Sequence, residues 1–455
     1  MLRFRHIRSL TLLLTLALLL AGCAGLPRQA SAPTPVPPAP AWSAELQALH
    51  DERLRVAGVE TRRFDADHWW TLADPLLAPA RGFRVQTIGQ SVEGRPLRHV
   101  AWGEGPIQVL AWSQMHGDES TGSMALLDLF RLLGEHPEHP LVAQLRQRTQ
   151  LHFLPMMNPD GAARFERRNA NGVDLNRDAH DLSQPESRAL KALFDQIRPD
   201  FGFNLHDQRP GYRAGDSERQ VAIALLSPPY DRSRRINAVR TRAIGVAAAI
   251  RAMLEPHIAG HIARWDDSFN PRAFGDLTTR WGSSTVLIEA GGIDGDPQKQ
   301  AVRRLYFLAL VAGLDAIASG SHAQMPAAIY HELPENGEVW PDLLLRGGTV
   351  MAPGNAAPVQ ADVLVNFRDP LAGTGGIIRR VGDLARVRAR SEVDISGLFL
   401  HPAPCPDSVP QPAPAGTIVA DAPACLRLSR DRAGTDVIWQ LLGDIDPARP
   451  RPPTL

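Results

Sequence analysis

Short apolar runs alternate with longer amphipathic stretches between Trp42 and about Gly320, and this alternation limits the possible fold more than any other feature of the sequence. Runs rich in β-branched and aromatic residues predict strands at Arg84–Ile88, Leu97–Trp102, Ile107–Trp112, Leu151–Met156, Phe201–Leu205, Val221–Leu226 and Thr285–Glu289. Amphipathic stretches predict helices at Gly122–Leu133, Glu186–Ile197, Arg234–Leu254 and Pro297–Ala318. Strands that alternate with helices are typical of α/β proteins, in which helices cover a sheet. We therefore expect an α/β domain over residues 42–320.

The chain changes in character after about Ala323. Short apolar runs are separated there by Gly and Pro, and they predict strands at Leu343–Leu345, Ala361–Phe367 and Gly375–Val381. The 455 residues also exceed what one hydrophobic core usually supports. We expect a smaller β-rich C-terminal domain over residues 321–455, and the sequence indicates no role for it.

The N-terminal segment has the features of an export signal. Three arginines within the first eight residues precede the apolar run Leu10–Leu20, which is short for a membrane-spanning helix. The residues Leu20–Cys23 resemble the lipobox of bacterial lipoproteins, which implies that the signal peptide 1–22 is removed and that Cys23 is lipidated. Ala24 rather than Asp follows, which resembles lipoproteins that are sorted to an outer membrane. The resemblance implies a cell-envelope protein anchored in the outer membrane and facing the periplasm. An ordinary secretory signal followed by an incidental cysteine is the alternative.

Two further features agree with export. Residues 23–41 hold the lipidated cysteine and a linker so rich in proline that it excludes a helix or the interior of a sheet. The remaining cysteines, Cys405 and Cys425, would mature in an oxidising compartment, which favours a disulfide between them. Two buried free cysteines are the alternative.

The charges of the chain balance, with 49 Lys and Arg against 49 Asp and Glu. Proteins that bind nucleic acid usually present a basic surface. We therefore expect no nucleic-acid partner, and the lipid on Cys23 is the predicted link to the membrane.

Candidate metal ligands follow two of the predicted strands. His116 and Glu119 lie in the loop after the strand that ends at Trp112. His206 directly follows the strand Phe201–Leu205. Ligands bind at the carboxyl edge of open α/β sheets, and a catalytic zinc ion usually takes three nitrogen or oxygen ligands from the protein. The three side chains are therefore candidates for a zinc site, although a lone histidine such as His206 is also typical of a loop or a core.

The stretch between these candidates is the most specific part of the sequence. It reads NPDGAARFERRNANGVDLNRD from Asn158 to Asp178. With this stretch the chain resembles the carboxypeptidase A-like zinc metallocarboxypeptidases, as a divergent bacterial lipoprotein member. The segments IGQSVEGRPL at 88–97 and TVLIEAGG at 285–292 are similar to the hairpin before the metal loop and to the catalytic-glutamate strand of that family. The blocks follow the family's order between about Trp70 and Ala318.

The resemblance implies roles for the candidate residues. His116, Glu119 and His206 would bind Zn²⁺, and Glu289 would be the general base. Zinc lowers the pKa of a water molecule that it binds, so a nearby carboxylate can take the proton as the water attacks a peptide carbonyl. For Glu289 the alternative is a strand-end carboxylate in a salt bridge, and Asp207 is the next candidate for the base.

The resemblance also implies how a substrate is held. Asn176 and Arg177 match the family pair that binds the terminal carboxylate of the substrate, to which a guanidinium can donate two parallel hydrogen bonds. The family's second arginine stabilises the developing oxyanion, and its spacing matches Arg167 better than Arg168. For Arg167 and for Arg168 the alternative is an arginine on the surface that contacts only solvent.

Two positions depart from the family's pattern. A substrate-binding tyrosine often lies roughly twenty residues before the catalytic glutamate, but RWDDSFNPRAFGD at 264–276 contains none. Tyr212 or Tyr230 could take its place in space. Asp178 stands where an asparagine is more usual after the Asn-Arg pair.

The sequence therefore predicts a zinc metallocarboxypeptidase whose catalytic domain is a mixed sheet flanked by helices. We expect it to hydrolyse the C-terminal amide bond of peptides that carry a free C-terminal carboxylate, cell-envelope peptides included. The closest alternative enzyme is a zinc deacylase of N-acyl amino acids, against which the complete run at 158–178 argues. The non-enzymatic alternative is a lipoprotein that binds peptides without turnover, against which the retained ligands and Glu289 argue.

Overall fold

The computed structural model describes residues 33–351, 357–406 and 416–443. The chain divides into two units, residues 1–35 and 36–455, and the elements below all belong to the second. The predicted signal peptide, Cys23 and most of the linker lie outside the described residues. Within the described ranges no helix combines the length and the apolar character needed to cross a membrane.

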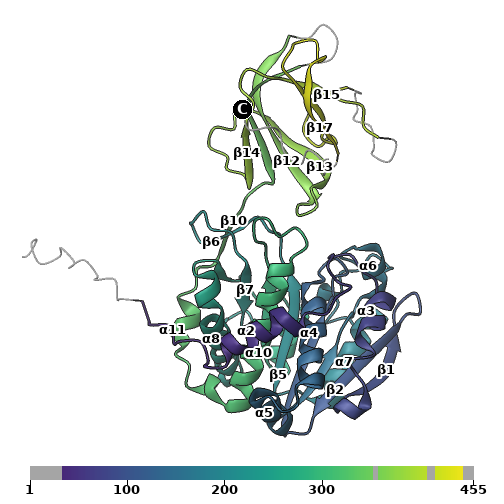
Figure 1. The fold of residues 1–455 in the computed structure, drawn as a ribbon, viewed down its shortest axis with the longest axis vertical. Coiled ribbons are helices and arrows are strands. Elements are labelled where there is room, and N and C mark those ends of the chain that lie inside the picture. The colour runs from purple at the N-terminus through teal and green to yellow at the C-terminus, as the bar shows by residue number, and fades with distance from the viewer. Residues whose placement is uncertain (1–32, 352–356, 407–415, 444–455) are drawn as a thin grey trace, which may run out of the picture. The chain divides into compact units, whose positions relative to one another are not determined.

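Among the described residues, eight strands form the sheet at the centre of the first domain (Figure 1). Their order is β1-β2-β4-β3-β5-β9-β7-β8. The strands are β1 (Arg84–Gln90), β2 (Pro96–Gly103), β3 (Ile107–Ser113), β4 (Thr149–Leu154), β5 (Phe201–Asp207), β7 (Ile223–Leu226), β8 (Ile262–Arg264) and β9 (Ser284–Ala290). β4, β3, β5 and β9 run parallel, whereas β2 pairs antiparallel with both β1 and β4. β7 pairs antiparallel with β9 and parallel with β8. The predicted mixed α/β sheet is therefore confirmed.

Helices cover both faces of this sheet. Alternate side chains of β3 show why: Val109 and Ala111 pack into a core with α4, α8 and α10, whereas Leu110 and Trp112 pack on the other face with α7 and α9. The helices and single turns of this domain are α2 (Ser43–Leu49), η2 (His50–Leu54), α3 (Ala66–Ala73), η3 (Pro79–Arg81), α4 (Thr121–Glu135), α5 (Pro140–Arg148), α6 (Pro159–Arg164), η4 (Leu175–Arg177), α7 (Pro185–Ile197), α8 (Ala238–Ile258), α9 (Phe274–Arg280), α10 (Gln300–Ser319), η5 (Ser321–Ala323) and α11 (Ala327–His331).

The arrangement of three strands brings the candidate site residues together. β3, β5 and β9 are adjacent and parallel, so their carboxyl ends meet at the same edge of the sheet. The residues that directly follow or end these strands are brought together although they lie far apart in the sequence.

The second sheet begins at Leu343, later than the predicted boundary at residue 321. The residues before it stay with the first domain, because Ile329 and Tyr330 of α11 are buried in its core and β10 (Asn336–Val339) pairs with β6 (Tyr212–Ala214). A helix as short as α11 gives little periodicity to detect in a sequence.

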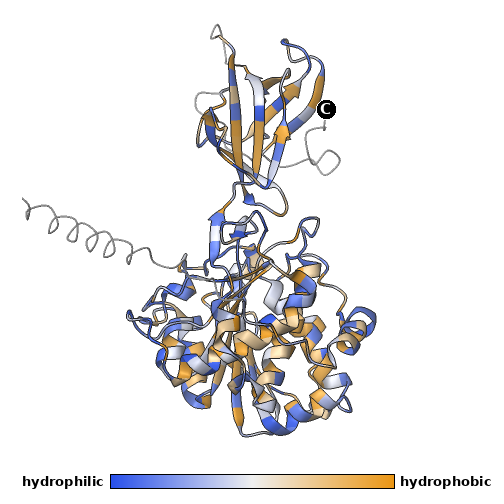
Figure 2. Ribbon diagram, turned by 90° about the vertical axis from the view of Figure 1, so that its left-hand side faces the viewer, coloured by the Kyte–Doolittle hydropathy of each residue, from blue (hydrophilic) through white to orange (hydrophobic). Residues whose placement is uncertain are grey.

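Seven strands in the described part of the C-terminal region form this second sheet, in the order β13-β12-β11-β15-β16-β17 with β14 beside β11. Bands of apolar and polar residues follow one another along them, as expected of strands that bury one face (Figure 2). The strands are β11 (Leu343–Val350), β12 (Val359–Asp369), β13 (Thr374–Gly382), β14 (Ser391–Asp394), β15 (Phe399–Pro402), β16 (Cys425–Ser429) and β17 (Val437–Leu442).

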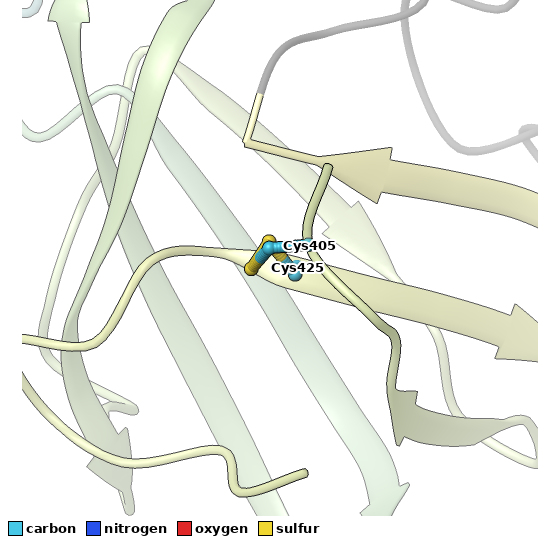
Figure 3. Close-up of a disulfide and its surroundings, with 2 residues drawn as sticks. All are labelled: Cys405 and Cys425. Carbon is cyan, nitrogen blue, oxygen red and sulfur yellow. A yellow bond between two sulfur atoms is a disulfide. The ribbon is translucent and has the colours of Figure 1, made fainter. Parts of the chain in front are cut away.

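A disulfide joins Cys405 to Cys425, the two cysteines paired in the sequence-based prediction (Figure 3). Their Cα atoms lie 5.4 Å apart, and both residues are buried. The bridge ties the chain after β15 to the start of β16, and it therefore closes a loop within the second domain.

Candidate metal centre and active site

The loop after β3 places the first two candidate ligands. Gln114, directly after the strand, adopts a left-handed φ of 53° and turns the chain out of the sheet. Its side-chain amide donates to the Gly117 carbonyl (2.9 Å), and the Glu119 N–H donates to the His116 carbonyl (3.1 Å). Gly117 is required for close packing, because a Cβ there would lie 2.0 Å from the carbonyl carbon of Gly161. The tight turn brings His116 and Glu119 together.

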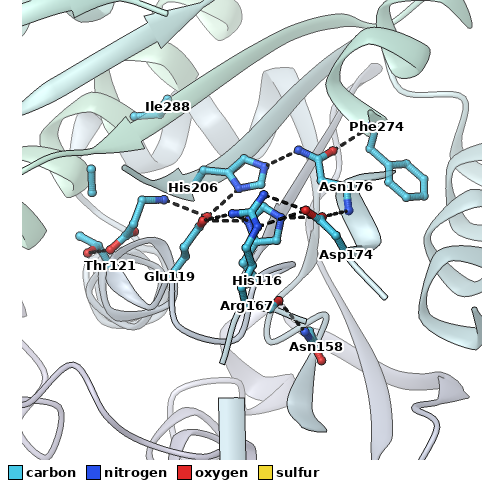
Figure 4. A network of polar contacts seen from close by, with 12 residues as sticks. His116, Glu119, Thr121, Asn158, Arg167, Asp174, Asn176, His206, Phe274 and Ile288 are labelled. Atoms are coloured by element: carbon cyan, nitrogen blue, oxygen red, sulfur yellow. Dashed lines mark hydrogen bonds and ion pairs between the residues drawn. The ribbon is translucent and has the colours of Figure 1, made fainter. Parts of the chain in front are cut away.

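Glu119 connects the two histidines (Figure 4). Its Oε1 lies 2.8 Å from Nδ1 of His116, and its Oε2 lies 2.7 Å from Nδ1 of His206. One ligand atom from each of the three residues lies within 4.8 Å of the others, and all three side chains are buried. Two imidazole nitrogens and a carboxylate oxygen are the donors of a catalytic zinc site that leaves a position for water. The donor set therefore fits zinc.

The electrostatics of the cluster also suit a cation. Burial raises the pKa of Glu119, but the charges of His116 and His206 outweigh burial and hold this pKa well below its ordinary value. Burial lowers the pKa of His206. For His116 burial is outweighed by the charge of Glu119, and the pKa is raised, so that a metal ion would compete with a proton there. An ionised carboxylate and neutral imidazoles are the forms that bind metals.

Glu289 lies beside the third candidate ligand. β5 and β9 pair in parallel with His206 opposite Glu289, so the two side chains leave adjacent strands at the same level. Glu289 is 7 % exposed, and its Oε2 has no hydrogen-bond partner within the described residues. Burial raises its pKa well above the ordinary value, and the charges of Glu119 and Asp207 add to this effect. A carboxyl group in this setting accepts a proton readily.

Asp174 is a site residue that sequence reasoning missed. Its Oδ1 accepts a hydrogen bond from Nε2 of His116 (3.0 Å), the nitrogen opposite the one that faces Glu119. The same oxygen accepts from the backbone N–H of Asn176 (2.9 Å) and so caps η4. A carboxylate at the second nitrogen of a metal-binding histidine fixes its tautomer and orientation. The signal was present in the sequence, since Asp174 lies within the Asn-Gly-Val-Asp-Leu-Asn-Arg run, but nothing in the sequence alone paired it with His116.

The structure distinguishes the two candidate arginines. Arg167 Nη1 lies 3.0 Å from Glu119 Oε1, and Arg167 Nε donates to Asp174 Oδ2 (3.1 Å). Arg168 instead donates to the Gly172 carbonyl (2.8 Å) and does not line the cleft. The geometry therefore brings Arg167 and not Arg168 to the candidate metal centre.

Asn176 and Arg177 lie on η4 at the edge of the same cleft. Asn176 accepts a hydrogen bond from the backbone N–H of Phe274 (2.9 Å), and its amide lies 3.4 Å from Nε2 of His206. The Arg177 side chain is exposed, and its Nη1 donates to the Asn176 carbonyl (2.7 Å). Asp178, which departs from the family pattern, is buried and accepts hydrogen bonds from Ser183 and the next residue, so it shapes the loop before α7.

Asp207 is engaged in other contacts. Its Oδ2 accepts hydrogen bonds from Lys299 Nζ (2.9 Å) and Thr121 Oγ1 (2.6 Å). Its backbone N–H donates to Glu119 Oε2 (3.1 Å). Asp207 Oδ1 and Glu289 Oε2 both lack a hydrogen-bond partner within the described residues. Because Asp207 is held in an ion pair with Lys299, Glu289 remains the better placed of the two to accept a proton from water.

A cleft of about 1560 Å³ opens above these residues. The candidate ligands, Glu289 and both candidate substrate-binding residues line it. Further lining residues of the first domain include Asn204, Tyr212, Leu226, Trp265, Phe269 and Leu287. The cleft is large enough for the end of a peptide chain.

Part of the chain is similar in sequence to known proteins. Residues 79–210 match the family Peptidase_M14, zinc carboxypeptidase. Carboxypeptidase SOL1 of Arabidopsis thaliana is 34% identical over 140 residues, which are 27% of this chain and 28% of that protein. The catalytic chain of carboxypeptidase N of Homo sapiens is 39% identical over 121 residues, 22% of this chain and 26% of the relative. The chain thus spans less than a third of the length of these relatives.

A crystal structure of a metallo-carboxypeptidase from Burkholderia cenocepacia is also similar. It aligns with a TM-score of 0.44 and 17% identity, over 58% of this chain and 71% of that chain.

Proposed function

We propose that the whole protein is a zinc-dependent metallocarboxypeptidase that removes the last residue of peptides, because residues 79–210 match the zinc carboxypeptidase family. One observation supports the activity more than any other. His116, Glu119 and His206 converge within 4.8 Å at the carboxyl edge of the sheet, and Glu289 lies opposite His206 on the neighbouring strand. Ligand set and base are thus assembled by three adjacent parallel strands.

The protein groups divide the chemistry among themselves. His116, Glu119 and His206 would hold Zn²⁺, which when bound lowers the pKa of water and polarises a carbonyl group. Glu289 accepts a proton from the attacking water and returns it to the leaving amine. Arg167, whose guanidinium reaches the cluster, donates to the oxygen on which negative charge develops.

The substrate in this proposal is a peptide with a free C-terminal carboxylate. Arg177 supports it, because this arginine is exposed in the cleft and forms no ion pair within the described part of the chain. A guanidinium binds a carboxylate through two parallel hydrogen bonds, which fix its position as well as its charge. Peptides of the cell envelope are included among the substrates.

Digestion of matched peptides tests the activity and the carboxylate grip together. The zinc-loaded protein should release the last residue of a free-acid peptide and leave the C-terminally amidated peptide nearly intact. Arg177→Ala should weaken transition-state binding of the free acid by about 2 to 5 kcal/mol, because a desolvated carboxylate loses its partner. Arg168→Ala, at an exposed arginine outside the cleft, is the control and should change little. Equal cleavage of acid and amide would reject carboxypeptidase action.

We also propose that a lipid on Cys23 anchors the protein in the outer membrane, where it faces the periplasm. The arginines and apolar run before Leu20–Cys23 support this location. Cys23→Ser should move the protein from the membrane fraction to the soluble fraction and leave its activity unchanged. Retention of the variant in the membrane fraction would reject the anchor.

A further inference from the structure

The chain has four tyrosines, and their hydroxyl groups have different surroundings. The Tyr306 hydroxyl is buried between strands, where it donates to the Ile288 carbonyl (2.7 Å). The Tyr330 hydroxyl accepts from the Ser227 N–H (3.0 Å) and is also buried. Both therefore serve the fold. Of the remaining two, only Tyr212 lines the cleft.

Tyr212 is held firmly at the wall of the cleft. It begins β6, where it lies opposite Val339 of β10, and its carbonyl accepts a hydrogen bond from the Val221 N–H (2.9 Å). Its ring packs edge-on against Trp265, with ring centroids 5.2 Å apart and planes inclined by 62°. Trp265 lines the same cleft. The ring position is thus fixed by backbone pairing and by an aromatic contact.

The segment that carries Tyr212 is also packed against the end of β9. A Cβ on Gly291 would lie 2.0 Å from the Val221 carbonyl oxygen, and a Cβ on Gly292 would lie 2.7 Å from Pro210 Cβ. These glycines follow Glu289 by two and three residues, so the backbone around Tyr212 is seated directly beside the strand end that carries the proposed base. Such close contacts leave little freedom for the two segments to move apart.

The Tyr212 hydroxyl is available for a ligand. It has no hydrogen-bond partner within the described residues, in contrast to those of Tyr306 and Tyr330. Burial raises the pKa of Tyr212, and the negative charge of Glu289 raises it further, so the phenol keeps its proton at neutral pH. A protonated phenol is a hydrogen-bond donor.

We propose that Tyr212 is a substrate-binding residue of this cleft, whose phenol donates a hydrogen bond to a backbone oxygen of the peptide bound beside Glu289. This inference rests on the proposed function and deepens it. It assigns one of the two tyrosines left open by the sequence, and it does so because Tyr212 lies in the cleft and Tyr230 does not. Trp265 acts as its support by holding the ring.

The test uses Tyr212→Phe, which keeps the ring and its contact with Trp265 and removes only the hydroxyl. The zinc-loaded full-length variant should hydrolyse an N-acylated dipeptide with a free carboxylate about ten- to hundredfold less efficiently, the loss expected for one hydrogen bond to a charged or polarised oxygen. Zinc content and thermal midpoint should match those of the wild type. Tyr230→Phe is the matched control and should retain wild-type kcat/KM.

Measurement of peptide binding shows whether Tyr212 contacts the substrate or only supports the fold. Glu289→Gln and the double variant Glu289→Gln with Tyr212→Phe should be titrated calorimetrically with the same dipeptide, which neither should consume quickly. Weaker binding by the double variant supports the inference. Equal binding, unchanged kcat/KM in Tyr212→Phe, or an equal loss in Tyr230→Phe would overturn it while the proposed function stands. Failure of the wild type to release the terminal residue would overturn the proposed function itself.

Discussion

Two pairs of buried histidines, one at the carboxyl edge of the first sheet and one on its strands, each bring two imidazole rings close together. The pairs differ in what surrounds them. The rings of His116 and His206 have centroids 4.9 Å apart, and those of His99 and His152 have centroids 5.1 Å apart. All four side chains are at most 7 % exposed. Distance and burial are therefore nearly equal in the two pairs, and neither can explain why only the first suits a metal ion.

The partners of the histidines make the difference. Glu119 contacts both rings of the first pair, and Asp174 contacts the outer nitrogen of one of them. In the second pair Nε2 of His99 lies 2.9 Å from Nδ1 of His152, and the outer nitrogens face the amides of Gln86 and Gln108.

The ring nitrogens of His99 and His152 thus form hydrogen bonds with each other and with neutral amides. Burial lowers the pKa of His99 to about 4 and that of His152 to about 3. Neutral partners leave a buried imidazole uncharged, whereas carboxylates create a place for a cation.

Removal of a candidate metal ligand should have the largest effect on zinc binding and activity. His116→Ala or His206→Ala should lose nearly all bound zinc and all measurable peptidase activity, because two protein ligands hold the ion poorly. His99→Gln, in the second pair, is the matched control and should keep about one zinc per chain with normal activity. Metal analysis of the purified variants measures both. Zinc loss in the control as well would show that the second pair also takes part in metal binding.

A substitution at Glu289 tests whether the carboxylates around His116 and His206 take part in proton transfer as well as in zinc binding. Glu289→Gln keeps the size and hydrogen bonding of the side chain but cannot accept a proton. Zinc should stay bound while kcat falls by about 10² to 10⁴, the usual contribution of a general base. Metal content and peptide hydrolysis are measured on the same preparation. If zinc were lost, or turnover stayed near normal, Glu289 would not be the base and Asp207 would be the next residue to examine.

A substitution at Asp174 can give His116 a neutral amide partner, like those of His99 and His152. Asp174→Asn replaces the carboxylate at Nε2 of His116 by an amide, as in the second pair. The affinity for zinc should fall about ten- to hundredfold, because the amide polarises the imidazole less. Competition with a chelator measures the change. Asp178→Asn changes a nearby buried aspartate whose carboxylate accepts hydrogen bonds from the loop before α7, and its zinc affinity should match the wild type.

The two pairs also show what a sequence can and cannot predict. The convergence of His116, Glu119 and His206 could be predicted because they follow strongly apolar strands, and the carboxyl ends of parallel strands meet at one edge. Glu289 was predictable from the strand that it ends. These signals are local, and the family resemblance joined them into one site.

Features that depend on strand register could not be predicted. His99 and His152 meet only because β2 and β4 pair with Ala101 opposite His152, and no local pattern encodes that register. The contact between Asp174 and His116 and the position of Tyr212 in the cleft likewise depend on segments distant in the sequence. The burial of Ile329 in the core of the first domain likewise depends on the packing of α11 and has no local signal in the sequence.

The smallest expected effect concerns the second pair and its dependence on pH. The pKa values of His99 and His152 are depressed to about 4 and about 3, whereas an unfolded chain has histidine values near 6.5. The unfolded state therefore binds more protons below about pH 6.5. The stabilisation is complete above that pH, and it is lost as the pH falls through the folded-state values.

His152→Gln removes one of these two groups, so the free energy of unfolding should depend less steeply on pH between about 4 and 6.5. The slope should decrease by up to about 1.4 kcal/mol per pH unit, the contribution of one proton. Urea denaturation in the presence of a chelator measures it, since the release of zinc then adds nothing to either slope. His180→Gln, at a histidine exposed to solvent, is the control and should reproduce the wild-type slope. Parallel slopes for the wild type and His152→Gln would mean that burial among neutral partners does not keep His152 uncharged. The contrast between the two pairs would then no longer rest on the charge of their partners.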